Sequence, residues 1–307
     1  MNQTQSPMRR LLEGVWQNRK ARAGALLVFL FSLLALIGPW LVGDPQSFDA
    51  VPLSPPGLSH WFGTTGQGQD VLAQTVYGSR QTLLVAFVTG FGVVLLGALI
   101  GGIGGFLGGW VDDVTSVFIN IFLVIPGLPL MVILAAWLPS GPFTMIGVLV
   151  ATGWAWNARV LRSKVLSLRK MDFVNAAIVS GEPAVSVLFR EILPNMLSLL
   201  MTSLIGATVY AIGAQVGLEF IGLGDPSTVT WGTNLYWARN DSALLMGAWW
   251  TFIPAGLAIA LVGFGLTLLN FGIDEVTNPR LRSEREWRNM VGEHIGDGPE
   301  TVVIPDA

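Results

Sequence analysis

Long apolar stretches alternate with short polar ones along most of the chain. A helix of about 20 apolar residues can cross the hydrocarbon core of a bilayer. The hydropathy pattern predicts such spans at about residues 23–42, 82–107, 114–137, 143–156, 196–223 and 244–273. We therefore expect an all-α integral membrane protein with about six transmembrane helices. The first apolar stretch exceeds the core of about 7–15 residues in a cleaved signal peptide, so we expect it to be retained as a span.

Two stretches within these spans are candidates for a helix break or kink. Residues 101–105 have the sequence Gly-Gly-Ile-Gly-Gly, and Ile125-Pro126-Gly127 lies in the third predicted span. Glycine and proline both weaken a helix interior, whereas small residues also allow close helix packing in a membrane. Because the glycine cluster lies in an apolar span, we interpret it as a packing surface and not as a nucleotide-binding loop.

The composition supports a membrane protein and excludes several kinds of site. Hydrophobic residues make up 52% of the chain and charged residues 12%, whereas soluble domains carry about 25% charged residues. The absence of cysteine excludes disulfides, iron–sulfur clusters and thiolate metal sites. Only two histidines occur, far apart at His60 and His294, so we expect neither a metal centre nor a catalytic dyad. The net charge of −3 gives no support for a nucleic-acid partner.

The basic residues predict the orientation of the chain in the membrane. With both termini in the cytoplasm, 15 of the 17 lysines and arginines fall on the cytoplasmic side, and only Arg80 and Arg239 fall outside. The loop with Asp112 and Asp113 lacks a basic residue, but acidic residues count little in this rule. We divide the chain into a cytoplasmic tail (1–22), a first span with an extracytoplasmic segment (23–78), a transmembrane core (79–275) and a second cytoplasmic tail (276–307).

The longest polar region between spans, residues 157–195, is predicted to lie in the cytoplasm. Its pattern predicts a helix capped by Asp172, a stop at Gly181 and Pro183, and a second helix over residues 184–191 that ends before Pro194. The first helix carries apolar and small side chains. It could lie on the lipid headgroups, or it could be a docking surface for a cytoplasmic partner.

This loop resembles the EAA loop of bacterial ABC importer permeases. The matching residues are Asn175-Ala176-Ala177, Gly181 and Leu193-Pro194, with Asn175 where the family prefers an acid. The resemblance implies a coupling helix that inserts into a groove of an ATPase subunit. The residues assigned to this ATPase-coupling loop are Phe173, Asn175, Ala176, Ala177, Gly181, Leu193 and Pro194.

Further motifs resemble the C-type dipeptide/oligopeptide permeases over nearly the whole chain. They are His60-Trp61-Phe62-Gly63-Thr64, Tyr77-Gly78-Ser79-Arg80, Gly108-Gly109-Trp110-Val111-Asp112, Phe220-Ile221-Gly222-Leu223-Gly224 and Asn278-Pro279-Arg280. The resemblance implies the type I ABC importer transmembrane fold in the cytoplasmic (inner) membrane. It also implies four kinds of partner: a homologous second permease subunit, two ABC ATPase subunits, an extracytoplasmic substrate-binding protein and the lipid bilayer. Peptides are the implied substrate, and relatives that carry oligosaccharides, glutathione or nickel chelates leave alternatives open.

The sequence lacks the nucleotide-binding motif of an ATPase. ATP hydrolysis requires a glycine-rich loop ending in Gly-Lys-Ser/Thr, and none of the three lysines, Lys20, Lys164 and Lys170, follows a glycine. We therefore expect a non-catalytic subunit with no cofactor of its own, whose partner ATPases use ATP-Mg. A passive channel or secondary carrier, and an intramembrane enzyme, are the rival classes. The spans lack the coupling charges and the paired catalytic groups that these rivals require.

Glu219 is the exception, because it is an acidic residue near the outer end of the fifth span. It could face the translocation path, or it could reach water at the outer headgroups. Eight tryptophans at or near the predicted interfaces indicate an aromatic belt: Trp40, Trp61, Trp110, Trp137, Trp231, Trp237, Trp249 and Trp250.

Overall fold

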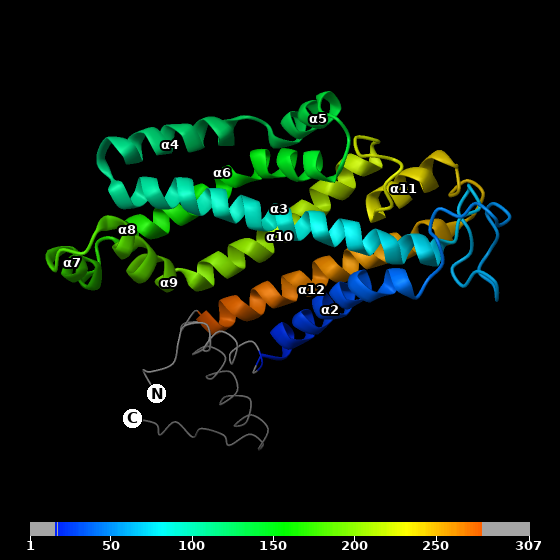
Figure 1. Ribbon diagram of the computed structural model, residues 1–307, viewed down its shortest axis with the longest axis horizontal. Helices are drawn as coiled ribbons and strands as arrows, with labels where there is room; N and C mark the ends of the chain where they lie inside the picture. Colours follow the sequence, from blue (N-terminus) through cyan, green and yellow to red (C-terminus); the bar gives the residue numbers. More distant parts are fainter. Residues whose placement is uncertain (1–15, 17, 278–307) are drawn as a thin grey trace, which may run out of the picture.

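The computed structural model describes residue 16 and residues 18–277 of the chain. Long helices lie side by side along a common direction (Figure 1), and between residues 18 and 277 the only β-type pairing is an isolated bridge between Thr64 and Asp70. Most of both predicted tails, together with the Asn278-Pro279-Arg280 motif and His294, lie outside the described residues.

The first half of the chain forms the upper part of the bundle in Figure 1 and one helix below it. Its elements are α2 (Arg19–Ile37), the 3-10 turn η1 (Gly38–Trp40), α3 (Val71–Leu107), α4 (Gly109–Val124), α5 (Gly127–Trp137) and α6 (Pro142–Leu168). The second half contributes α7 (Asp172–Val179), α8 (Ala184–Ser186), η2 (Val187–Ile192), α9 (Leu193–Asn195), α10 (Leu197–Phe220), α11 (Trp231–Asn240), η3 (Trp249–Thr251) and α12 (Ile253–Thr277).

The membrane-spanning helices fall where the hydropathy pattern predicts them. Within the described part of the chain, α2 with η1, α3, α10 and η3 with α12 are each long and apolar enough to cross a membrane. The pair α4 and α5, bent by 81°, provides a fifth crossing if it is counted as one span. Helix α6 packs along α3 and completes the about six expected spans. The second half of α6, which includes Asn157, Arg159 and Arg162, is too polar for composition alone to identify α6 as a membrane span.

Helix α3 is longer than predicted. The apolar stretch suggests a start near residue 82, but the helix begins at Val71 because the Asp70 side chain caps it, accepting a hydrogen bond from the Ala73 N–H at 2.9 Å. The first turns of α3 are polar, so hydropathy alone missed them. The proposed domain boundary between residues 78 and 79 falls inside this helix.

The two candidate breaks behave differently. Helix α3 runs unbroken through residues 101–105, where Gly101 lies against the backbone of Ala158 and Gly105 against that of Arg162. The packing interpretation of this cluster is therefore confirmed, and a helix break there is wrong. The break at Ile125-Pro126 is confirmed, because the residue before a proline favours extended backbone and Ile125 has φ −67° and ψ 126°.

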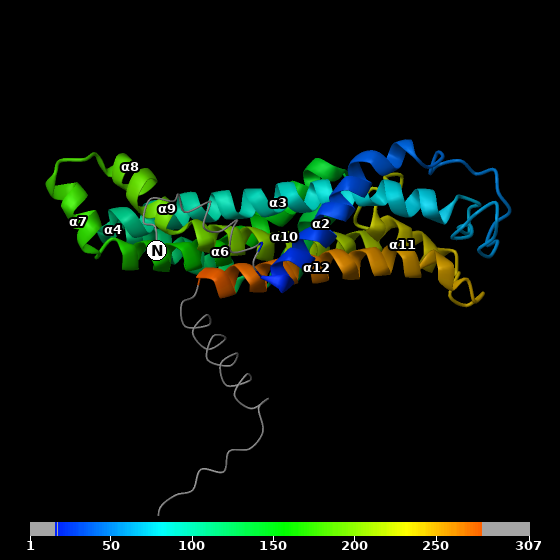
Figure 2. The ribbon, with the colours of Figure 1, turned by 90° about the horizontal axis from the view of Figure 1, so that it is seen from below.

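The bundle has two distinct ends, which Figures 1 and 2 show. We name the end that carries α7, α8 and α9 the α7 end, and the opposite end, formed by α11 and residues 41–70, the α11 end. Helix α2 begins and α12 ends toward the α7 end (Figure 1). Arg162 of α6 donates two hydrogen bonds, of 2.5 and 2.8 Å, to Asp112 of α4 near the same end. The acidic loop that lacks a base in sequence thus pairs with one in space.

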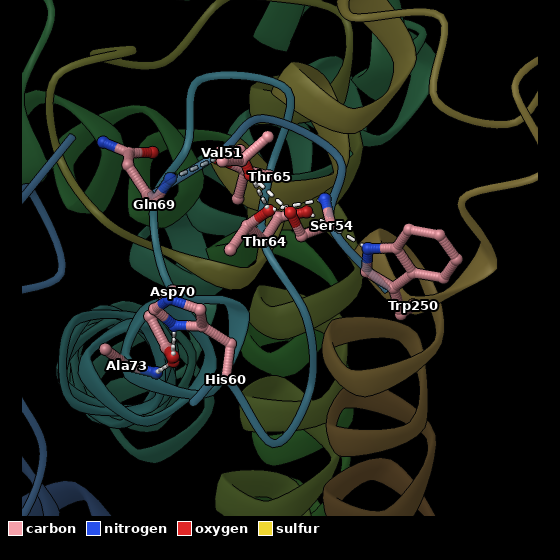
Figure 3. A network of polar contacts seen from close by, with 9 residues as sticks. All are labelled: Val51, Ser54, His60, Thr64, Thr65, Gln69, Asp70, Ala73 and Trp250. Atoms are coloured by element: carbon pink, nitrogen blue, oxygen red, sulfur yellow. Dashed lines mark hydrogen bonds and ion pairs between the residues drawn. The ribbon is translucent and has the colours of Figure 1, made fainter. Parts of the chain in front are cut away.

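Residues 41–70 fold without regular secondary structure through side-chain hydrogen bonds (Figure 3). The Thr64 hydroxyl accepts from the Ser54 N–H at 2.8 Å and donates to the Val51 carbonyl at 2.7 Å. The Trp250 indole donates to the Thr64 carbonyl at 3.1 Å, which ties this segment to the turn before α12. His60 Nδ1 lies 2.8 Å from the Asp70 carboxylate that caps α3.

Candidate functional site

Helix α7 lies at the tip of the α7 end, beyond the long helices (Figure 1). Val174 is its only fully buried residue and belongs to an apolar cluster that includes Leu168 and Val187. Ala177, three residues later on the same face, packs against this cluster. The helix is therefore held by one narrow apolar face, and most of its surface is exposed.

Gly181 ends α7 in a Schellman motif. Its backbone has φ +81°, its N–H donates to the Ile178 carbonyl at 3.0 Å, and the Glu182 N–H donates to the Ala177 carbonyl at 3.1 Å. These are the two bonds of that motif, and the left-handed residue within it is usually glycine. The predicted stop at Gly181 is confirmed. The role of Gly181 is conformational, since no atom lies within 4 Å of the position that a Cβ would occupy.

The predicted start of α7 is off by one residue. Met171 occupies the N-cap position with no side-chain cap, and Asp172 is the first helical residue. The Asp172 carboxylate still lies in the first turn, where a negative charge complements the helix dipole. Asn175 and Ala176 are exposed on the following turn.

The predicted second helix over residues 184–191 is also corrected. The chain runs as α8, a π-helical turn η2 and α9, and Pro194 lies inside α9 instead of after a helix end. The Leu193 N–H donates to the Leu188 carbonyl in the wider π pattern. Because Pro194 has no N–H to donate, a widened turn directly before it disturbs fewer backbone bonds. Leu193 is half-buried and Pro194 is exposed.

Large apolar side chains are exposed along this segment. Val179 is 88% exposed, and five others share its character: Met171, Phe173, Ile178, Val185 and Phe189. Several large exposed apolar side chains on a polar segment are typical of a contact with a partner or a membrane. The structure therefore leaves the same two alternatives as the sequence, lipid contact and protein docking.

Glu219 is buried near the α11 end of α10. Its side-chain carboxylate accepts hydrogen bonds from the Gln215 amide at 2.9 Å and the Thr230 hydroxyl at 2.6 Å, and the residue is only 6% exposed. The alternative in which it reaches headgroup water is therefore wrong. Gly224 and Gly232 border the carboxylate, and a Cβ at either position would collide with the Glu219 side chain.

Trp231 belongs to the core of the α11 end and not to an aromatic belt. It is fully buried, its indole donates to the Thr75 carbonyl at 3.0 Å, and its backbone N–H donates to the Thr82 hydroxyl at 3.1 Å. Together with the Glu219–Thr230 bond, these contacts fix the start of α11 to both α3 and α10.

A cavity of about 750 Å³ opens between the α4–α5 bend and helices α6, α10 and α12. Its polar lining residues are Thr152, Asn157, Thr202, Ser203, Tyr210, Asn270 and Asp274. Glu219 does not line it and instead borders a cavity of about 20 Å³. Sequence reasoning missed this polar lining, although the four-residue spacing of Asn270 and Asp274 on an apolar helix was a usable signal. Between residues 18 and 277, no three His, Cys, Asp or Glu side chains gather as a metal site would require.

The bent span, the bundle and the small helix at its tip define a multi-pass membrane component. A family model described as binding-protein-dependent transport system inner membrane component matches residues 93–283. The chain belongs to this family of transport proteins.

Two curated relatives extend the similarity beyond that region. The dipeptide transport system permease protein DppC of Bacillus subtilis (strain 168) is 30% identical over 289 residues, covering 92% of this chain and 87% of the relative. The oligopeptide transport system permease protein OppC of the same organism is 30% identical over 270 residues, covering 86% of this chain and 87% of the relative. The similarity thus extends beyond the region that the family model matches.

Proposed function

We propose that the chain is a peptide permease subunit of an ATP-driven importer in the inner membrane. The observation that carries the proposal is family membership combined with similarity over 86–92% of the chain to permeases named for dipeptide and oligopeptide transport. The chain would form half of the translocation path with a homologous second permease. Two ATPase subunits would supply the energy, and a binding protein would deliver the substrate.

In this proposal α7 is the coupling helix and the α7 end faces the cytoplasm. Its exposed apolar side chains and its attachment by a single face suit insertion into a groove of another protein. The orientation draws support from the concentration of lysines and arginines predicted at that side. Both termini would then be cytoplasmic, since α2 begins and α12 ends toward the α7 end.

The cavity beside the α4–α5 bend is this chain's share of the path. Its volume of about 750 Å³ lies within the range typical of small-molecule sites, and its mixture of aromatic and hydroxyl groups suits a solute with both apolar and polar parts. Closure of the ATPases on ATP-Mg would move α7 and, through the Val174 cluster, α6 and α10. Coupling requires that the inward-open and outward-open states differ in affinity for the ATPases and the binding protein.

A charge substitution at Ala176 tests the docking surface. Ala176 is exposed and makes no buried contact, so Ala176→Glu should leave the subunit folded while it places a carboxylate in the groove contact. Substrate-stimulated ATPase activity of the assembled transporter should fall about tenfold or more, since one unpaired buried charge costs several kcal/mol. Ala177→Glu should also abolish the stimulation, with an added loss of α7 packing.

Ser59→Glu is the matched control, because it adds the same charge to an exposed residue at the α11 end. It should leave the substrate-stimulated ATPase activity unchanged. If Ala176→Glu kept wild-type ATPase stimulation, α7 would not be the coupling helix. The alternative in which α7 contacts lipid would then be favoured.

A further inference from the structure

A second cavity, of about 420 Å³, lies at the α11 end between residues 46–74 and the start of α11. Its volume is within the range typical of small-molecule sites. All its lining residues belong to the described part of the chain, and none of them is ionisable. Four of the lining side chains are amides and two are aromatic: Gln46, Gln67, Gln69 and Gln74, and Phe48 and Trp237. Because a buried charge needs a partner, the cavity suits a neutral hydrogen-bonding group better than an ammonium or a carboxylate.

Two of these amides, Gln69 and Gln74, are held in one fixed arrangement. They are only 8% and 7% exposed. Gln74 Nε2 donates to the Pro45 carbonyl at 2.6 Å and to Gln69 Oε1 at 3.1 Å. A backbone carbonyl only accepts hydrogen bonds, so the Gln74 atom that faces it is the amide nitrogen. The Gln69 atom that faces this nitrogen is then the amide oxygen.

Each of the two amides has one end unused. Within the described part of the chain, Gln69 Nε2 and Gln74 Oε1 have no hydrogen-bond partner, because the bonds of this pair involve only Gln69 Oε1 and Gln74 Nε2. Neither atom is among the buried polar atoms that lack a partner, so both are accessible, and both residues line the cavity. The cavity wall therefore presents amide N–H donors beside a carbonyl acceptor.

An extended peptide carries the complementary groups on one edge. In a hydrogen-bonded pair of strand residues, each residue uses both its N–H and its C=O toward the other. We propose that Gln69 and Gln74 form a subsite that binds the main chain of a passing peptide. The Gln69 amide donates to a peptide carbonyl, and the Gln74 carbonyl accepts from a peptide N–H. Phe48 and Trp237 offer surface for the peptide's side chains. This inference rests on the proposed function, in which peptides enter at the α11 end.

The neutral lining also selects a class of peptide. Successive residues of an extended chain lie about 3.3 Å apart, so the peptide bond of a dipeptide is close to both charged termini. A longer peptide has a neutral interior that can occupy the cavity while its termini stay in water. The expected solute is therefore an oligopeptide, in preference to a zwitterionic dipeptide.

Protection of a thiol tests the subsite. The chain has no cysteine, so Gln67→Cys places the only thiol of this chain at the cavity wall. The assembled transporter in nanodiscs, without its binding protein, is labelled with an uncharged maleimide, and the labelled chain is measured by mass spectrometry. The neutral peptide N-acetyl-trialanine amide should slow labelling about tenfold at ten times its Kd, because only unoccupied sites react. Zwitterionic dialanine at the same concentration should leave the rate nearly unchanged.

Gln69→Glu separates hydrogen bonding from simple crowding of the thiol. The new carboxylate still accepts from Gln74 Nε2, but it replaces the free N–H donors with an acceptor. The Kd of the neutral peptide should rise about tenfold or more, since its carbonyl loses a partner. Asn240→Asp is the matched control, because it makes the same change at an exposed residue of α11 that does not line the cavity. It should leave the Kd unchanged.

Trp237 provides a second reporter that needs no cysteine. Its indole lines the cavity, so the fluorescence change that the neutral peptide causes in wild type and that Trp237→Phe removes should saturate with the same Kd. If the neutral peptide neither protects the Gln67→Cys thiol nor changes Trp237 fluorescence, the subsite is overturned, whether or not the Gln69→Glu variant folds. Equal protection by dialanine or by maltotriose, or an unchanged Kd in Gln69→Glu, overturns it as well.

The remaining outcomes separate this inference from the proposed function. Protection by the ligand-free binding protein but not by the neutral peptide would assign the cavity to protein docking and overturn the subsite. If wild type transports peptides while the neutral peptide does not bind, the permease stands and only the subsite falls. If no peptide is transported but the neutral peptide still binds in a manner that depends on Gln69, the proposed function falls and the peptide-binding subsite stands.

Discussion

The two ends of the bundle differ in how their polar and apolar groups are used. At the α11 end, Glu219 and Trp231 are buried, and side-chain hydrogen bonds link α11 to α3 and α10. At the α7 end, α7 buries only Val174 fully and exposes most of its apolar side chains. The start of α11 thus has the Thr230 hydroxyl and the Trp231 indole paired within the chain. Four predictions test this difference, from the largest effect to the smallest.

Removal of the Trp231 side chain should produce the largest loss. Trp231→Ala leaves a cavity at a fully buried site and should lower the free energy of unfolding by about 3–5 kcal/mol. Trp231→Phe should lower the free energy of unfolding by less than Trp231→Ala does, since phenylalanine retains a ring but not the hydrogen bond to the Thr75 carbonyl. The unfolding midpoint in detergent measures both. Trp61→Ala, at a residue 72% exposed, is the control, and an equal loss there would contradict the buried role of Trp231.

Glu219 should contribute to stability through the hydrogen bonds that its carboxylate accepts. Glu219→Ala removes the acceptor for Gln215 and Thr230 and should cost about 1–3 kcal/mol, the penalty for leaving buried polar groups unpaired. Glu219→Gln should cost less, because the Gln carbonyl still accepts one of the two bonds. Unfolding midpoints separate the variants. Transport and substrate range unchanged in Glu219→Gln would also end the hypothesis that Glu219 faces the path.

Gly181→Ala should damage coupling more than global stability. An alanine at φ +81° carries a strain of about 1 kcal/mol, borne by the short α7. Faster amide exchange in residues 172–182 and weaker ATPase stimulation, with an unchanged unfolding midpoint, are expected. Gly217→Ala is the control, since its site in α10 has no atom within 4 Å of a new Cβ and no left-handed φ. Equal exchange in α7 of both variants would contradict the capping role of Gly181.

The smallest predicted effect is a pH dependence in the loop before α11. Hydrogen bonds from the Ser227 hydroxyl and N–H, and from Thr228, hold the pKa of Asp225 below its usual value. Because the pKa of Asp225 is lower in the folded state than in the unfolded state, its hydrogen bonds stabilise the loop above the unfolded pKa. This stabilisation is lost as pH falls through the folded pKa. The loop should therefore loosen in acid, below the ordinary aspartate range.

Trp237 reports this change, because its indole donates to the Pro226 carbonyl within the loop. The fluorescence difference between wild type and Trp237→Phe should shift on acidification. Ser227→Ala should move that shift to higher pH, since the pKa of Asp225 loses its largest lowering contribution. An unchanged acid transition in Ser227→Ala would contradict the assignment.

Local chemistry allowed part of the candidate site to be predicted. Gly181 ends α7 because the Schellman motif needs a left-handed residue at that point, and Pro126 breaks the third span for an equally local reason. The second helix was mispredicted because a π turn accommodates Pro194 inside a continuous helical segment. A proline removes one backbone hydrogen bond, but its presence in the sequence does not reveal how the neighbouring helical turn rearranges.

By itself, the sequence determined that the chain crosses a membrane about six times and where most spans lie, because burial in lipid requires long apolar helices. The tertiary structure alone decided which polar groups meet: Asp112 with Arg162, Glu219 with Thr230, and Asn270 and Asp274 on the wall of one cavity. The physical reason is that hydropathy records how apolar each helix is, whereas the faces that helices turn toward one another depend on packing between residues far apart in the chain.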